Sequence, residues 1–151
     1  MEITLKEVYR GPCRTLVTLQ LEADTQLADF LKFLTASNPN AVRSLQTSMA
    51  TITSVEIYHN ERKFKHVGDG VFEIKVPGIR LYCFKEEIDG FPSKLIIATN
   101  GGSKNTKREQ NSDIRRAARL KERYFAAKAS ADTTLHYQQL DHEDPDHHSK
   151  A

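Results

Sequence analysis

The residues of this sequence whose number and spacing indicate a chemical role are lysines and arginines. Residues 101–128 hold nine Lys and Arg against three Asp and Glu, whereas the chain before them holds twelve of each. A smaller basic group, Arg62, Lys63 and Lys65, precedes a strand-like stretch, and Arg80 lies inside that stretch. Because affinity for nucleic acid depends largely on neutralised phosphates, several basic groups around one sheet predict a phosphate-binding surface. The alternative is an ordinary solvated surface.

Other chemistries are less well supported by the residue pattern. Histidine and carboxylate side chains cluster near the C-terminus, at His142, Glu143, Asp144, Asp146, His147 and His148. Such groups can bind a divalent ion, but a tail of this composition offers them no fixed geometry, so we expect no metal and no cofactor. The stretch TNGGSKNT, residues 99–106, lacks the spacing of a phosphate-binding Walker loop. No serine, histidine and aspartate pattern indicates nucleophilic catalysis.

Length and composition indicate one soluble domain with an appendage. The 151 residues are enough to bury a core, and the hydrophobic share of 38% is ordinary for a soluble protein. No apolar run approaches the roughly 20 residues that cross a bilayer, and the N-terminus does not read as a signal peptide. We therefore expect a cytoplasmic protein without a membrane partner. Cys13 and Cys83 are expected to be small buried residues and not a disulfide.

The first half of the chain predicts a strand followed by a helical hairpin. Residues 14–21, RTLVTLQL, alternate and are rich in β-branched side chains, which favours a strand. Residues 26–37 repeat apolar side chains at helical spacing behind a possible cap at Thr25. Pro39 suits the start of a second helix over residues 40–52. Two short helices joined by a tight turn predict an αα-hairpin.

An antiparallel β-meander is predicted next. Residues 71–76 and 79–84 form two strands around a Pro-Gly turn, and residues 94–99, KLIIAT, are a continuous apolar run typical of a central strand. NGGS, residues 100–103, is expected to end that strand. Residues 54–59, SVEIYH, predict a further short strand or strand-like run. The predicted fold class is α+β, with the meander packed against helices.

A basic helix is predicted after the meander. It begins near Asn111 or Ser112, either of which can cap it, and runs to about Ala127. Arg115 and Arg119 recur four residues apart and belong to an exposed basic edge.

The composition changes again after this helix. Residues 129–151 carry five acidic residues, one lysine and four of the six histidines, with few large apolar side chains. This predicts a domain over residues 1–128 and a disordered acidic tail over residues 129–151. Deleting residues 131–151 is then expected to leave the melting temperature nearly unchanged.

The order of four short motifs resembles a known family. GVFEIKV, GIRLYCF, KNTKR and DIRRA, spread over roughly residues 62–125, are similar to the RelE/HigB superfamily of toxins, specifically its phage-derived HigB-like branch. The preceding αα-hairpin fits the layout of that branch. The resemblance implies the toxin of a type II toxin–antitoxin pair, with a helix-turn-helix antitoxin as its cognate partner. It also implies a metal-independent endoribonuclease that cleaves mRNA on the ribosome.

The chemistry implied by the resemblance needs positioning and charge stabilisation. The ribose 2′-OH attacks the adjacent phosphate and leaves a 2′,3′-cyclic phosphate, and Lys or Arg donors stabilise the charge that develops. Arg80 matches the strand arginine of the family and is the first catalytic candidate; Lys104, just after the last strand, is the second. Further RNA contacts are implied for Lys63, Lys65, Lys75, Lys107 and Arg108. The helical row adds Arg115 and Arg119, which contact either RNA or the antitoxin.

The sequence also departs from the family pattern. Gly101 and Gly102 stand where the branch has a phenylalanine, and a proline ahead of the helix is replaced around Gln110. No tyrosine or histidine occupies an obvious acid or base position after the last strand, although Tyr82 and His66 are near the meander. The alternative is therefore a non-catalytic RNA- or protein-binding module on the same scaffold.

Overall fold

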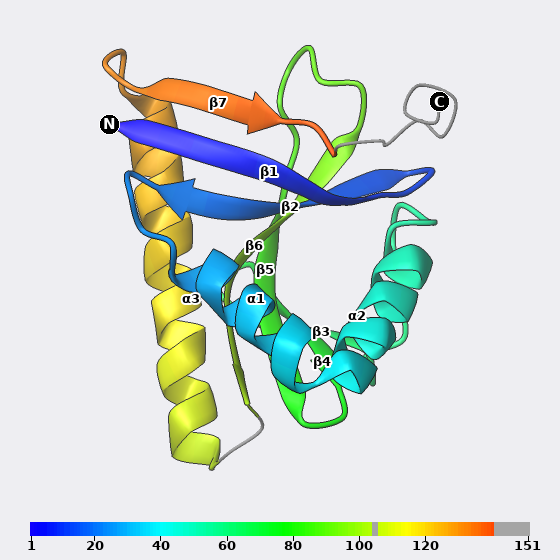
Figure 1. Cartoon of the computed structure of the whole chain (residues 1–151). Coiled ribbons are helices and arrows are strands. Elements are labelled where there is room, and N and C mark those ends of the chain that lie inside the picture. Colours follow the sequence, from blue (N-terminus) through cyan, green and yellow to red (C-terminus); the bar gives the residue numbers. More distant parts are fainter. Residues whose placement is uncertain (104–105, 141–151) are drawn as a thin grey trace, which may run out of the picture.

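A single mixed sheet runs through the computed structural model of the chain, which describes residues 1–103 and 106–140 (Figure 1). The described residues form seven strands in the spatial order β3-β4-β5-β6-β2-β1-β7, and three helices. The strands are β1 (Glu2–Arg10), β2 (Arg14–Leu21), β3 (Phe64–Gly68), β4 (Val71–Val76), β5 (Ile79–Glu86), β6 (Lys94–Ser103) and β7 (Thr134–Gln138). The helices are α1 (Gln26–Ser37), α2 (Pro39–Ile52) and α3 (Lys107–Ala129). The fold class is α+β.

The sheet joins two antiparallel units through a parallel pair. Strands β4 to β6 form the predicted antiparallel meander, which β3 extends by one further strand, and β1 and β2 form an N-terminal hairpin. The two units meet where β2 pairs with β6 in parallel, with Leu16 opposite Ile96. Strand β7 then pairs in parallel with β1, with Leu135 opposite Ile3. Segments from both ends of the chain therefore share one edge of the sheet.

The helices cover opposite faces of the sheet. The αα-hairpin packs on one face, where Leu45 and Met49 join Ile74, Leu81 and other buried side chains in one apolar cluster. Helix α3 packs on the other face and forms a second cluster with β1, β2, β5 and β6. Burying a Leu, Ile or Phe side chain stabilises the fold by about 1.5–3 kcal/mol, so these two clusters hold the three layers together. No helix within the described ranges is long and apolar enough to cross a membrane.

Local signals account for the helices of the hairpin. Helix α1 spans the predicted residues 26–37, and α2 begins at Pro39 as expected. The side chain of Asn38 caps α2 by accepting a 3.2 Å hydrogen bond from the amide of Ala41. The prediction of two helices joined by a tight turn is confirmed.

Helix α3 begins earlier than predicted. Its first residue is Lys107, because Thr106 and Glu109 form a capping box: the Thr106 hydroxyl accepts from the Glu109 amide, and the Glu109 carboxylate accepts from the Thr106 amide. The predicted starts at Asn111 and Ser112 are wrong, because this threonine and glutamate pair satisfies the free amides one turn sooner. The helix continues to Ala129.

The last strand of the meander is longer than predicted. Strand β6 continues through the NGGS segment to Ser103, with Gly101 and Gly102 paired to Leu81 and Arg80 of β5. The expectation that NGGS ends the strand is wrong. Residues 54–59, expected to be strand-like, contain turns and bends and no strand.

The prediction of a disordered tail is wrong for residues 134–138, which form β7. The Tyr137 ring packs edge-on against Phe91, and its hydroxyl donates a 2.6 Å hydrogen bond to Glu7 on β1. A domain boundary at residue 128 would therefore separate α3 from a strand of the same sheet. The predicted tail also includes residues 141–151, which lie outside the described residues. Strands β1 and β3 were not predicted.

Candidate functional site

A basic depression lies at the end of the meander where β4 turns into β5. It has a volume of about 350 Å³ and is lined by Arg62, Lys63, Lys75, Val76, Pro77, Gly78 and Arg80. Among the described residues, four of the seven that line the depression are cationic and none is acidic or aromatic. A hollow with this lining attracts an anion through charge and N–H donors and offers no surface for stacking a base. The chemistry that it fits is the binding of a phosphate group.

Strand pairing brings these cations together. Lys75 lies directly opposite Arg80 in the β4–β5 pair, which places both side chains on the same face of the sheet. The Lys75 amide donates a 2.9 Å hydrogen bond to the carbonyl of Lys63, which fixes the turn before β3 beside them. The tight Pro77–Gly78 turn closes the depression, and Gly78 has φ +80°, a conformation that glycine adopts without strain.

Arg80 is already engaged with its own turn. Its Nη1 donates hydrogen bonds of 3.2 Å to the carbonyl of Val76 and 3.1 Å to that of Ile79. Its Nε lies 3.4 Å from Oε1 of Glu73, and both side chains are largely buried, at 11% and 8% exposure. Arg80 is therefore a fixed donor at the wall of the depression, whereas Arg62 and Lys63 are exposed.

A polar group of side chains lies beside Arg80 on the α3 face of the sheet. Tyr82 is fully buried, and its hydroxyl faces Glu73 without making a hydrogen bond of ordinary geometry with the described residues. Burial and the nearby carboxylates of Glu73 and Asp113 raise the pKa of Tyr82 well above its usual range. Burial and the charge of Glu109 also raise the pKa of Asp113.

These surroundings bear on the two acid or base candidates from the sequence. Tyr82 shares a sheet face with Arg80 as expected, but it is buried and remains protonated at neutral pH, so it cannot take a proton from a substrate in the depression. His66 is exposed on β3, where its Nε2 is within 3.3 Å of the Gly70 amide and its ring tilts against Phe72. Neither residue lines the depression.

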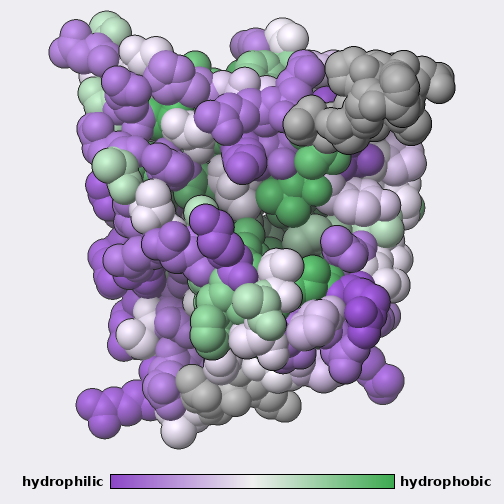
Figure 2. Space-filling view, viewed as in Figure 1, coloured by the Kyte–Doolittle hydropathy of each residue, from purple (hydrophilic) through white to green (hydrophobic). Residues whose placement is uncertain are grey.

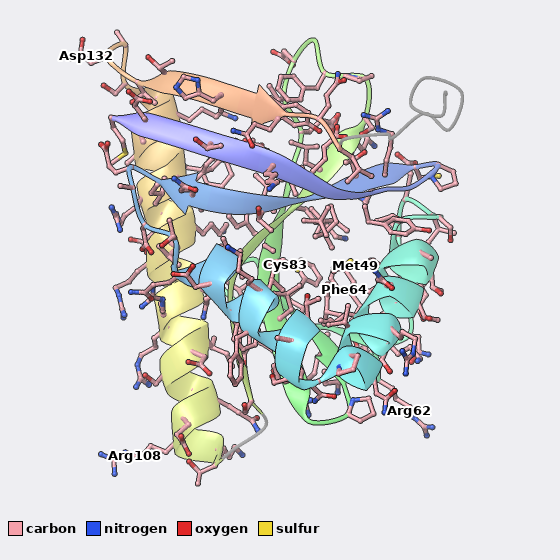
Figure 3. The ribbon with its side chains drawn as sticks, viewed as in Figure 1. Met49, Arg62, Phe64, Cys83, Arg108 and Asp132 are labelled. Carbon is pink, nitrogen blue, oxygen red and sulfur yellow. The ribbon has the colours of Figure 1, made fainter. Side chains whose placement is uncertain are left out.

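The structure separates the other predicted contacts from the depression. Lys65 is exposed on β3 and lies opposite Glu73, which is two residues before Lys75 on β4. The four predicted contacts on α3 are exposed but do not line the depression; they are Lys107, Arg108, Arg115 and Arg119. Figure 3 shows Arg62 and Arg108 projecting at the same lower end of the molecule, from opposite sides. Lys104 lies outside the described residues.

Two glycines of β6 let the helices approach this end of the sheet. A Cβ at Gly101 would collide with the Phe30 ring on α1, at 2.8 Å from Cδ2 and 3.1 Å from Cζ. On the opposite face, a Cβ at Gly102 would lie 2.5 Å from Oδ2 of Asp113 on α3. The glycines that depart from the family motif are therefore packing positions inside a strand and not part of an open loop.

Two residues of the site were missed at the level of sequence. Arg62 was noted only as part of a basic group, and Glu73 was not singled out. The alternating pattern of β4 places Glu73 on the same side as Lys75. The sequence did contain a signal for a buried ion pair: Glu73 lies inside a predicted strand, two positions from Lys75 and near the strand residue Arg80.

Two larger hollows lie elsewhere. A cavity of about 630 Å³ lies where β1, β7 and the β5–β6 loop meet, but its one carboxylate, Glu7, already accepts hydrogen bonds from Arg10, Tyr137 and the Leu140 amide. An apolar groove of about 540 Å³ lies between the αα-hairpin and β1, where Figure 2 shows hydrophobic side chains gathered at the middle of the face. Neither hollow collects unpaired charged groups.

Metal chemistry is not indicated by the described residues. Within residues 1–103 and 106–140, no three His, Cys, Asp or Glu side chains lie close enough to hold an ion. The histidines and carboxylates of residues 142–148, for which we expected no metal, lie outside these ranges. The thiols of Cys13 and Cys83 are free, and burial raises the pKa of Cys83 far above its usual range.

Comparison with known proteins places the chain in no family. No protein-family model, no curated protein and no solved structure matches it.

Proposed function

We propose that this protein binds RNA through the basic depression and is the endoribonuclease toxin of a type II toxin–antitoxin pair. The observation that carries the proposal is the convergence of four cations, Arg62, Lys63, Lys75 and Arg80, on one hollow that no acidic residue of the described ranges lines. Three of these residues are the ones that the family motifs assign to RNA. The RelE-like character of the fold is part of the same proposal and rests on the order of the motifs.

The depression suits one step of metal-independent RNA cleavage. When the ribose 2′-OH attacks the adjacent phosphate, negative charge builds on the phosphate oxygens. Lys75 and Arg80 supply N–H donors from one wall, while Arg62 and Lys63 raise the local positive potential. Because no aromatic residue in the described part of the chain lines the depression, its lining favours recognition of the RNA backbone over recognition of a base.

The second candidate is a non-catalytic RNA-binding module on the same scaffold. One observation favours it: within residues 1–103 and 106–140, no carboxylate, histidine or tyrosine that could move a proton lines the depression. Substrate binding and cleavage therefore have to be measured separately.

The test uses the full chain, a single-stranded RNA and two lysine variants. We expect the wild type to arrest bacterial growth when produced alone and to release fragments ending in 2′,3′-cyclic phosphate in the presence of a chelator. Lys75→Gln should lower the cleavage rate by about 10²–10³, which is the usual effect of removing one transition-state donor. Lys32→Gln, at an exposed position of α1 outside the depression, is the matched control.

The outcomes separate the two candidates. RNA binding that Lys75→Gln weakens, without any cleavage by the wild type, supports the non-catalytic module. If the wild type and the Lys75→Gln variant bind RNA equally and also do not differ in cleavage, both candidates are refuted, because Lys75 in the depression then neither binds RNA nor acts on it.

A further inference from the structure

The three guanidinium nitrogens of Arg80 have different surroundings. Nη1 donates to two carbonyls of the β4–β5 turn, and Nε is buried against Oε1 of Glu73. Nη2 makes no hydrogen bond with the described residues and is not among their buried, unpartnered atoms. Hydrogen bonds therefore hold the Nη1 side of the guanidinium group, and Nε is buried 3.4 Å from the Glu73 carboxylate without a hydrogen bond to the described residues. Nη2 is not buried, and Arg80 lines the depression.

The buried acid is unexpected in a site that attracts anions. Glu73 is only 6% exposed, and its one ion-pair partner among the described residues is Arg80. Moving a carboxylate out of water is costly, and its charge opposes the binding of a phosphate. A glutamate that only repels the ligand would weaken the site. Its position therefore calls for a role that offsets this cost.

Glu73 can offset this cost if it orients the side chain of Arg80. An arginine side chain loses considerable rotamer freedom when it binds a ligand, and less freedom is lost if the planar group is already held in place. The Glu73 carboxylate lies 3.4 Å from Nε of Arg80 as a buried ion pair, and the fully buried Tyr82 is the cross-strand neighbour of Glu73. Because the charges of Glu73 and Arg80 cancel, the pair contributes a directed donor, and Arg62, Lys63 and Lys75 contribute the net charge.

We propose that Glu73 is a positioning residue that orients Arg80 so that Nη2 contacts a phosphate oxygen of RNA in the depression. This inference rests on the proposed function in taking RNA as the ligand. It predicts an effect opposite in sign to simple electrostatics. Neutralising an acid beside a phosphate site should tighten binding if charge alone mattered. If Glu73 positions Arg80, neutralising it should weaken binding.

The experiment compares Glu73→Gln with Glu86→Gln in the full chain. Glu86 is the matched control, because it is also a buried glutamate, at 8% exposure, and is ion-paired with Lys128 at 2.6 Å on another part of the α3 face. Both substitutions remove one negative charge. Binding of a short fluorescein-labelled oligouridylate is measured at low salt and across a salt series.

We expect Glu73→Gln to weaken oligouridylate binding about tenfold at low salt and Glu86→Gln to leave it unchanged or slightly tighter. Arg80→Lys, which keeps the charge but loses the planar fork, should weaken binding at least as much as Glu73→Gln. Unchanged or tighter binding by a folded Glu73→Gln variant overturns the positioning role.

A second measurement does not depend on RNA or on the stability of one variant. The Nε–H resonance of Arg80 in an NMR spectrum should be resolved in the wild type and broadened by exchange with water in Glu73→Gln. Glu73→Asp should restore part of the signal. A resonance that is equally sharp in Glu73→Gln refutes the inference even if oligouridylate binds. Failure of the proposed function looks different: the wild type does not bind oligouridylate, while the Arg80 signal still depends on Glu73.

Discussion

Replacing Gly101 by alanine tests how the αα-hairpin is seated on the sheet. The new methyl group would collide with the Phe30 ring, 2.8 Å from Cδ2 and 3.1 Å from Cζ. Overpacking of this kind costs about 1–3 kcal/mol, whereas the loss of glycine freedom in the unfolded chain returns about 0.4–1 kcal/mol. We expect a net loss of about 0.5–2 kcal/mol in the free energy of unfolding.

The size of the thermal effect follows from the length of the chain. For a protein of this size, 1 kcal/mol shifts Tm by about 2–4 °C, so Gly101→Ala should lower Tm by about 1–8 °C. Circular dichroism with heating and with urea measures both quantities. Gly90→Ala is a useful comparison, because its cost comes from φ +85° with no atom near the added methyl group.

A double-mutant cycle with Phe30→Ala isolates the contact. Without the ring there is no collision, so the same Gly101→Ala change should become neutral or stabilise by about 0.4–1 kcal/mol. An equal loss in both backgrounds, or a gain in the wild-type background, would refute the account of Gly101 as a packing position.

Three further predictions concern the strand edge and the helix. Burial acts to raise the pKa of Glu7, but hydrogen bonds from the Leu140 amide, Tyr137 and a neighbouring arginine outweigh it and hold this pKa below the ordinary 4.5. The contribution of the ionised Glu7 to the free energy of unfolding is thus complete above about pH 4.5, and it is lost as the pH falls through the pKa of Glu7 in the folded protein. Glu7→Gln should therefore make Tm depend less on pH in the acid range of a Tm–pH profile. Ending the chain at residue 130, which removes β7, should lower the free energy of unfolding in urea by about 2–4 kcal/mol, whereas loss of a disordered tail would leave it unchanged. An unchanged Tm would contradict the packing of β7. Replacing Arg115 and Arg119 by Gln should flatten the slope of log affinity against log salt by about 0.7 per lost contact with single-stranded RNA, and an unchanged slope would assign these arginines to a protein partner.

The sequence by itself determined the elements whose signals are local. Helices α1 and α2 follow from apolar spacing, a cap and a proline that all lie within a few residues of each other. The strands of the meander follow from alternation around a Pro-Gly turn. Local signals were also sufficient to show that basic residues surround this sheet. The start of α3 was local as well, but its Thr-x-x-Glu capping box was overlooked.

Only the tertiary structure decided which distant segments meet. The pairing of β7 with β1 joins residues more than 130 positions apart in the sequence. The short alternating pattern of β7 resembles a tail by itself, because the contacts of Tyr137 with Glu7 and Phe91 exist only in the folded chain. Glycines at 101 and 102 indicate a loop in isolation, because the helices that require the missing side chains are remote in the sequence.

For the candidate site too, the sequence determined one part and the tertiary structure another. The types of its residues were readable, since Lys63, Lys75 and Arg80 stand in recognisable positions of the chain. Their convergence on one depression, and the burial of Glu73 against Arg80, depend on strand register. Register is set by pairing between segments, because a shift of one residue would move each side chain to the other face of the sheet.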